Sequence, residues 1–136
     1  MNKTIKNLIQ EINCLYTWQD KYAFIIDIGR RLPFLSKYLK LDHNIVYGCA
    51  NKVWVHCYAI KNKFYFQADG NGQIIKGILY IILLVSNGKT QKEICDINYQ
   101  ETFSQLDLLR NLTMNRSHGL LEVTERIKHV VQSWFL

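Results

Sequence analysis

The sequence predicts an α+β fold in which helices pack on one side of a small antiparallel sheet. Three observations predict it. Apolar residues recur at helical spacing over residues 3–15, and the same spacing returns over 117–134 near the other end of the chain. Between these segments, residues 52–60 are rich in β-branched and aromatic side chains and alternate between two faces.

The N-terminal part is expected to be helical. Residues 3–15 form an amphipathic pattern, and Thr17 followed by Asp20 is typical of a capped helix start. That second helix should end near Gly29, because Pro33 follows closely. We expect one further short helix over residues 34–41.

Two strands should form an antiparallel hairpin. Residues 52–60 are the first strand, residues 61–63 the polar break, and residues 64–68 the second strand. Residues 44–47 are compatible with a third strand. In the first strand, one face carries Val53, Val55, Cys57 and Ala59.

The remaining chain is expected to return to helices. Residues 69–72 form a turn that can cap a helix over 73–86, which is apolar almost all round and should be central and buried. Thr90 and Glu93 form a capping box. Further helices are expected over 99–107 and 117–134.

Length and composition bound the class of protein. A chain of 136 residues predicts one domain over residues 1–136, and an apolar fraction of 49% excludes a disordered or low-complexity chain. The apolar run 74–85 is shorter than the roughly 20 residues of a membrane span. With no apolar signal segment at the N-terminus, we expect a cytoplasmic protein with reduced thiols and no membrane partner.

Most signatures of catalysis are missing. The sequence has no Walker or dinucleotide glycine motif, no G-x-S-x-G, no H-E-x-x-H and no C-x-x-C, so neither a cofactor nor a metal site is predicted. Of the four cysteines, Cys57 should face the core, and Cys14 and Cys95 are interpreted as incidental.

Cys49 differs in its surroundings. It lies between Gly48 and Ala50, just before the hairpin, where small neighbours leave the sulfur accessible. Lys52 is close enough in sequence to favour the thiolate. Cys49 is therefore the candidate reactive residue, as a loop thiol that attacks an external group.

The residues around Cys49 resemble a known family. Segment 45–54, with Gly48-Cys49 and Val53-Trp54, resembles the V-x-G-C-x-S-x-V-W pattern of the SufE family, with Asn51 in place of the usual Ser. Three more segments resemble that family in the same order. They are Trp18 to Pro33, Ala68 to Leu79 and Leu112 to Leu120.

The resemblance implies a fold shared with the scaffold IscU and a role as sulfur acceptor. Such a protein stimulates a cysteine desulfurase of the SufS or CsdA type, takes its sulfane sulfur as a persulfide on Cys49, and delivers the sulfur to the SufBCD complex for iron–sulfur cluster assembly. It is thus a carrier with a covalent intermediate rather than an ordinary enzyme.

We expect apolar side chains, Trp54 among them, to shelter the bound sulfur. Asp69 and Arg116 fall on polar family positions and are assigned to partner binding. A homodimer, and the SufE versus the CsdE branch, stay open.

Two other functions are alternatives for a chain of this composition. A net charge of +6, with aromatic residues at Trp54, Tyr58, Phe64 and Phe66, fits a basic nucleic-acid-binding module, but the basic residues are scattered and we expect no nucleic acid partner. A metal scaffold needs several convergent thiolates, which the spacing of the cysteines does not predict.

Overall fold

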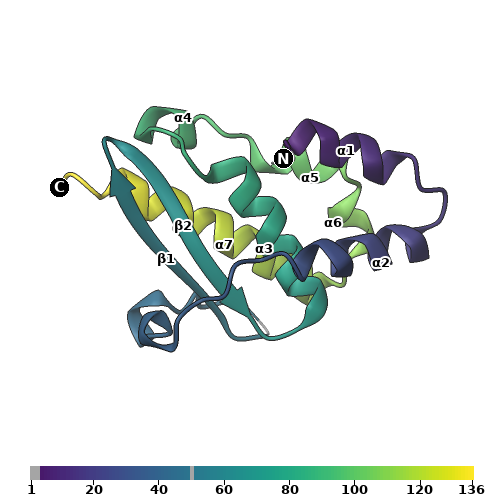
Figure 1. Ribbon diagram of the computed structural model, residues 1–136, viewed down its shortest axis with the longest axis horizontal. Helices are drawn as coiled ribbons and strands as arrows, with labels where there is room; N and C mark the ends of the chain where they lie inside the picture. Colours follow the sequence, from purple (N-terminus) through teal and green to yellow (C-terminus); the bar gives the residue numbers. More distant parts are fainter. Residues whose placement is uncertain (1–3, 50) are drawn as a thin grey trace.

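The computed structural model describes residues 4–49 and 51–136 and has an α+β fold. Figure 1 shows a two-stranded antiparallel hairpin with α3 (Gln73–Ser86) and α7 (Met114–Gln132) along one face. The helices α1 (Ile5–Asn13) and α2 (Trp18–Gly29) lie beyond α3. The predicted fold class is confirmed.

The first two helices begin where the sequence predicts. The Thr17 hydroxyl accepts a hydrogen bond from the Asp20 N–H and caps α2. Between α2 and the hairpin, the described residues form only the short 3-10 helices η1 (Lys37–Leu39) and η2 (Asp42–Asn44). The expected helix over 34–41 is thus reduced to one turn.

The hairpin consists of β1 (Val53–Ile60) and β2 (Lys63–Gly70). Lys61 and Asn62 connect them with φ values of 51° and 67°, the left-handed pair that a two-residue turn requires. The third strand does not form. Residues 44–47 contribute a single bridge, Ile45 to Trp54, because the 3-10 helix η2 ends at Asn44 and the chain turns at Gly48.

Helix α3 is the centre of the core, as its composition predicts, and it packs closely on α2. A Cβ added to Gly77 would come within 2.1 Å of the Ile25 carbonyl oxygen, so only glycine allows this approach. The expected side-chain cap is absent: Gly72 occupies the N-cap position, and Asp69 and Gly70 instead end β2.

The C-terminal half completes the helical layer. The Thr90–Glu93 capping box opens α4 (Gln91–Cys95), and α5 (Tyr99–Gln105) precedes a short α6 (Leu108–Asn111) that the sequence did not predict. Helix α7 begins at Met114, earlier than expected, because the Thr113 hydroxyl accepts the Arg116 N–H. Among the described residues, no helix is both long and apolar enough to cross a membrane.

Candidate functional site

Cys49 lies at the end of the segment that leads into β1, where that segment meets α7. Gly48 precedes it with a φ of 95°, a backbone conformation that residues with a side chain rarely adopt. A Cβ at Gly48 would also come within 3.0 Å of the Glu122 side chain. Glycine at this position therefore lets the chain turn sharply and bring Cys49 onto the helix.

The Cys49 thiol faces the backbone of α7. Its Sγ lies 3.6 Å from the carbonyl oxygen of Gly119, to which the S–H donates a weak hydrogen bond. A Cβ on Gly119 would come 3.3 Å from this sulfur, so a larger residue there would press on the thiol. Gly119 thus makes the space that the sulfur occupies.

A small apolar cavity adjoins the thiol between β1, α3 and α7. Its volume is about 10 Å³, close to the cavity volume that a single water molecule needs. Apart from Cys49, Gly119 and Arg116, the lining is aliphatic and comes from Val53, Ile75, Ile78, Leu79, Leu120 and Val123. The site can therefore shield one additional atom bound to the sulfur from water.

The electrostatic setting of Cys49 favours the neutral thiol. Burial raises the pKa of Cys49, and the negative charge of Glu122 raises it further. The expectation that Lys52 stabilises the thiolate is wrong. The Lys52 ammonium lies over the Trp54 ring, 5.6 Å from its centroid, and the charged residue that acts on the thiol is acidic.

One side of α7 contacts the Cys49 segment, residues 43–49, at both of its ends. Gly119, Glu122 and Arg126 follow each other at helical spacing, so they share a face. The Arg126 guanidinium donates to the His43 carbonyl oxygen at 3.2 Å and to the Ile45 carbonyl oxygen at a shorter distance. Arg126 therefore holds the start of this segment by hydrogen bonds, and the weak Cys49–Gly119 contact holds its end.

Arg116 lies at the rim of the same cavity. Its guanidinium donates a hydrogen bond to the Tyr22 hydroxyl and lies 6.0 Å from the centroid of that ring. This contact joins the first turn of α7 to α2 and holds the guanidinium against the Tyr22 ring. The structure thus brings Arg116 together with Cys49, two residues that are far apart in the sequence.

The Asp69 carboxylate forms ion pairs with two lysines of the same chain. Its carboxylate accepts from Lys40 and Lys76, each at 2.8 Å, and its side chain is 15% exposed. Burial raises its pKa, but the hydrogen bonds from Lys40, Lys76 and the Gly70 N–H outweigh burial and hold the pKa below its ordinary value. Asp69 does not line the Cys49 cavity. Its described contacts join β2 and α3 to the segment after η1.

The other cysteines have different surroundings. Cys57 lies in β1 opposite Phe66, and burial raises its pKa to about 12. Cys14 is exposed after α1, and Cys95 is half-buried at the end of α4. Within residues 4–49 and 51–136, no group of three or more His, Cys, Asp or Glu side chains is placed to hold a metal ion.

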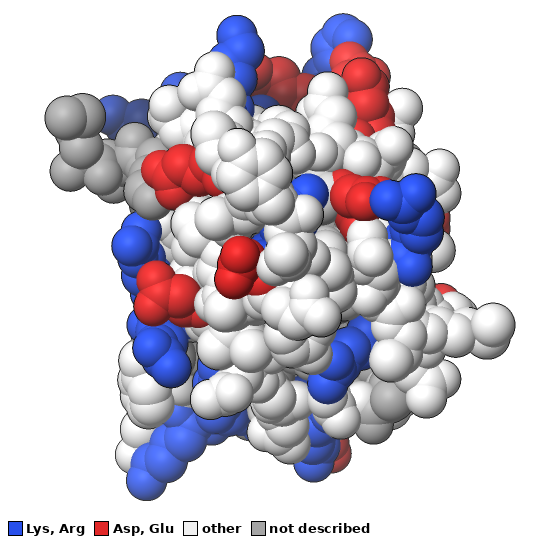
Figure 2. Space-filling view, turned by 90° about the vertical axis from the view of Figure 1, so that its right-hand side faces the viewer, with Lys and Arg blue, Asp and Glu red and all other residues white. Residues whose placement is uncertain are grey.

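The aromatic residues do not form a nucleic-acid platform together. Phe64 and Phe66 are 0% and 3% exposed and belong to the core, so they cannot stack on bases. Trp54 is half-buried beside Lys40 and Lys52, and of the four rings only Tyr58 is exposed. Figure 2 shows Lys and Arg interspersed with Asp and Glu on the face it presents, rather than gathered in one basic patch.

The model of the family described as "SufE: Fe-S metabolism associated domain" matches residues 6–131. The chain belongs to the SufE family. The match covers the segment of Cys49 and the α7 face that holds it. The resemblance read from the four sequence segments is confirmed.

Named relatives agree with this assignment. The cysteine desulfuration protein SufE of Wigglesworthia glossinidia brevipalpis is 34% identical over 132 residues, covering 94% of this chain and 91% of that protein. The sulfur acceptor protein CsdE of Escherichia coli is 35% identical over 114 residues, covering 83% and 78%. A SufE-like protein of Rhizobium etli is 30% identical over 129 residues, covering 92% and 87%.

The fold is also shared with a solved structure. The solution structure of a hypothetical protein from Thermus thermophilus superimposes with a TM-score of 0.77 at 14% sequence identity. The alignment covers 96% of this chain and 95% of that chain. At this identity the likeness concerns the fold alone.

Sequence reasoning missed several residues of this SufE-family site. Gly119 lies within the family-like segment Leu112 to Leu120, but no sequence pattern predicts that it, Glu122 and Arg126 contact residues about 70 to 80 positions earlier. Trp54, which was expected to shelter the sulfur, does not line the cavity and packs instead beside Lys40 and Lys52. Ala50 lies outside the described residues.

Proposed function

We propose that this SufE-family protein accepts a sulfane sulfur from a cysteine desulfurase and carries it as a persulfide on Cys49. One observation carries the proposal: the Cys49 thiol adjoins an aliphatic cavity with room for about one atom. A terminal persulfide sulfur matches this space in size and polarity. The names of the Wigglesworthia and Escherichia coli relatives, which refer to cysteine desulfuration and to a sulfur acceptor, support the same role.

The transfer is an exchange at sulfur without net oxidation or reduction. Cys49 first loses its proton, and its thiolate attacks the terminal sulfur of the desulfurase persulfide. A new S–S bond forms to Cys49 while the S–S bond on the desulfurase breaks. The desulfurase cysteine leaves as a thiolate, which is then ready to accept the next sulfur. Removing the persulfide in this way stimulates the desulfurase.

The resting site protects the thiol at the cost of its reactivity. Because burial and Glu122 both raise the pKa of Cys49, little thiolate exists in the free protein at neutral pH. Docking must therefore draw the segment away from α7 or place a positive charge near the sulfur. We expect Cys49 to be alkylated slowly in the free protein and faster with the desulfurase bound. Equal alkylation rates in the two states would contradict this step.

The surface around Cys49 is suited to docking the desulfurase. Tyr47 and Met114 are 69% and 88% exposed, although both side chains are large and largely apolar. Arg116 adds a fixed positive charge beside the cavity. We assign Arg116 to direct contact with the desulfurase, and Asp69 to partner binding through the Lys40 segment that it holds. Delivery of the sulfur to a SufBCD complex completes the proposed cycle.

The experiment that tests the proposal compares two cysteine variants. Cys49→Ser should fold and bind a matched desulfurase, yet fail to stimulate sulfide release from cysteine. Cys57→Ala is the matched control, because Cys57 is also half-buried but lies in the β1 ladder. Normal stimulation by Cys49→Ser would refute the acceptor role, whereas loss in both variants would indicate general damage to the fold.

A further inference from the structure

A carboxylate lies beside the Cys49 thiol, on the face of α7 that the thiol contacts. A Cβ at Gly48 would lie 3.1 Å from the carboxyl carbon of Glu122 and 3.4 Å from its Oε2. Gly48 is bonded directly to Cys49, and the Cys49 sulfur contacts the Gly119 carbonyl oxygen, about one helical turn before Glu122. The Glu122 charge is therefore fixed next to the residue that carries the reactive sulfur.

The two sides of the thiol differ in polarity. The inner side is the aliphatic cavity of about 10 Å³, which has room for about one atom. Glu122 does not line this cavity, and its side chain is 39% exposed. Its neighbour His118, with Nε2 3.5 Å from the Glu122 carboxylate, is 59% exposed. A small molecule that attacks the sulfur therefore comes from the solvent side, where the carboxylate lies.

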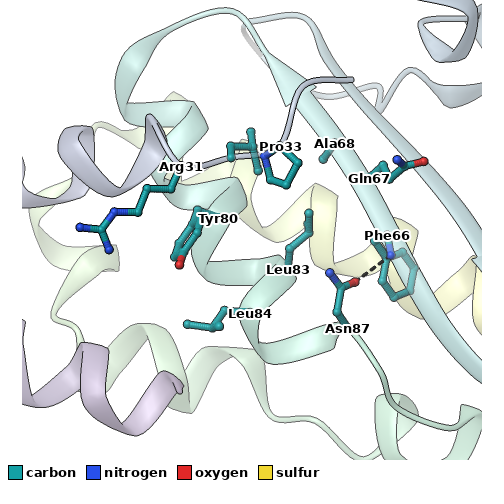
Figure 3. Close-up of a pocket in the computed structure, with 10 residues that line it drawn as sticks. Arg31, Pro33, Phe66, Gln67, Ala68, Tyr80, Leu83, Leu84 and Asn87 are labelled. Carbon is teal, nitrogen blue, oxygen red and sulfur yellow. Dashed lines mark hydrogen bonds between the residues drawn. The ribbon is translucent and has the colours of Figure 1, made fainter. Parts of the chain in front are cut away.

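The largest groove of the molecule gives no second route to the sulfur. Figure 3 shows it between β2 and α3, with Tyr80, Leu83 and Leu84 on its helical side. Its volume is about 540 Å³, and it shares no lining residue with the Cys49 cavity. A small molecule in this groove therefore does not meet the thiol.

The positive charges nearest in sequence or space have other partners. The Arg116 guanidinium donates to a hydroxyl of α2, and the Lys52 ammonium lies over an aromatic ring of β1. The charge of Glu122 does act on the sulfur, since it raises the pKa of Cys49. A charged reagent that reaches this sulfur from solvent experiences the same negative field.

We propose that Glu122 selects the reaction partners of Cys49 by charge, repelling small anionic thiolates and favouring a partner cysteine that has basic side chains beside it. This inference rests on the proposed role of Cys49 as a sulfur acceptor. It assigns to Glu122 a specificity for the sulfur transfer, which is separate from its effect on the amount of thiolate.

The reaction that Glu122 suppresses is loss of the sulfur to a small thiol. A small thiolate attacks the terminal sulfur of the Cys49 persulfide, and a new S–S bond forms to the small molecule. The S–S bond at Cys49 breaks, and Cys49 leaves as a thiolate, without net oxidation or reduction. A small thiol that carries carboxylates approaches against the Glu122 charge, whereas a partner cysteine beside Lys or Arg is attracted.

The test measures charge selectivity at the free Cys49 thiol with a matched pair of reagents. Aminoethyl methanethiosulfonate is a cation and sulfonatoethyl methanethiosulfonate is an anion. Each transfers its thioethyl group to the thiolate as a mixed disulfide and releases methanesulfinate. Peptide mass spectrometry gives both rate constants at Cys49. Their ratio at one pH cancels the fraction of thiolate, so a change in the pKa of Cys49 does not alter it.

Glu122→Gln should lower the ratio of the cationic to the anionic rate constant. We expect a change of roughly fourfold to ninefold, because a twofold to threefold effect of one screened charge acts on each reagent with opposite sign. In about 1 M sodium chloride, where the screening length is about 3 Å, the ratio of the wild type should fall toward that of Glu122→Gln.

Glu125→Gln is the matched control. It removes the same charge from the same helix, but Glu125 lines a different depression, beside the chain between α4 and α5. Its ratio at Cys49 should equal that of the wild type. Cys14, which is exposed after α1, reports the two reagents in the same digests, and its ratio should not change in either variant.

The loaded protein provides the second measurement. With the persulfide on Cys49, mercaptoethanesulfonate should remove the sulfur more slowly from the wild type than from Glu122→Gln, and cysteamine should remove it faster from the wild type. An unchanged reagent ratio in Glu122→Gln, or an equal change in Glu125→Gln, overturns the charge selection even if Cys49 carries sulfur. Absence of a persulfide on Cys49 overturns the acceptor role instead, and with it the selection of sulfur partners, even if the ratio changes.

Discussion

Cys49 and Cys57 lie only eight residues apart and are buried to a similar degree, but they are held in different ways. Cys57 belongs to β1, opposite Phe66, in a regular hydrogen-bonded hairpin. Cys49 precedes β1, follows a glycine with a positive φ, and touches α7 through one contact of 3.6 Å. Burial raises the pKa of both thiols.

This difference teaches that burial alone does not decide which thiol reacts. Moving Cys57 to a partner requires breaking the β1–β2 ladder, which is part of the cooperative core. Moving Cys49 requires releasing the Gly119 contact and the few hydrogen bonds that hold residues 43–46. The protein therefore combines a shielded sulfur with a low barrier to exposing it.

Arg126 provides the largest expected change. Arg126→Ala removes both hydrogen bonds to the carbonyl oxygens of His43 and Ile45, which shifts the Cys49 segment toward its open form. A loss of roughly 1.4 kcal/mol corresponds to about a tenfold faster alkylation of Cys49 in the free protein. Alkylation of Cys57, followed by peptide mapping in the same sample, should not change.

Arg126→Lys is the matched control, since an ammonium retains the charge and one of the donated hydrogen bonds. Its alkylation rate should lie between those of the wild type and Arg126→Ala. If Arg126→Ala leaves the Cys49 rate unchanged, Arg126 does not hold the Cys49 segment against α7.

Cys57 should matter for stability rather than for sulfur transfer. Cys57→Ala removes a half-buried sulfur that lines a cavity between β1 and α7, and we expect a loss of about 1 kcal/mol in the free energy of unfolding. Urea denaturation followed by tryptophan fluorescence measures this loss. Sulfur loading from the desulfurase should stay at the wild-type level, and a large defect in loading would mean that Cys57 takes part in the transfer.

Glu122 should have the smallest effect, confined to the pH dependence of Cys49. Its negative charge disfavours the thiolate, so Glu122→Gln should lower the pKa of Cys49 and raise its alkylation rate at any pH below that pKa. Because the Glu122 side chain is 39% exposed, solvent screens the interaction, and we expect roughly a twofold to threefold change. A pH–rate profile that does not shift toward lower pH would contradict the assigned charge effect.

Much of the fold could be predicted because its elements carry local signals. Thr17 and Thr90 cap helices where hydroxyl and acidic residues predict caps, and β1 follows its alternating pattern. The prediction of a third strand is wrong because it rests only on the composition of residues 44–47. In the structure, Gly48 ends the pairing of this stretch after one bridge. Helix α6 is one turn long and has no side-chain cap to signal it.

The candidate site was predictable only in part. Cys49 can be identified from its small neighbours and from the family-like pattern of segment 45–54, both of which are local in sequence. Distance along the chain points to Lys52 as the charge that acts on its thiol, because sequence alone gives no other guide. Folding brings Glu122 to the thiol instead, and Arg126 to the preceding segment, through tertiary contacts that no sequence period encodes.

The most direct test of the central claim is to incubate the wild-type protein with a cysteine desulfurase and cysteine, and then locate the added sulfur by mass spectrometry of its peptides. The account predicts one additional sulfur atom, removable by a reductant, on the peptide that contains Cys49. It predicts none on the peptides that contain Cys14, Cys57 or Cys95 in the same digest. An added sulfur on another cysteine, or no reducible sulfur on Cys49, would contradict it.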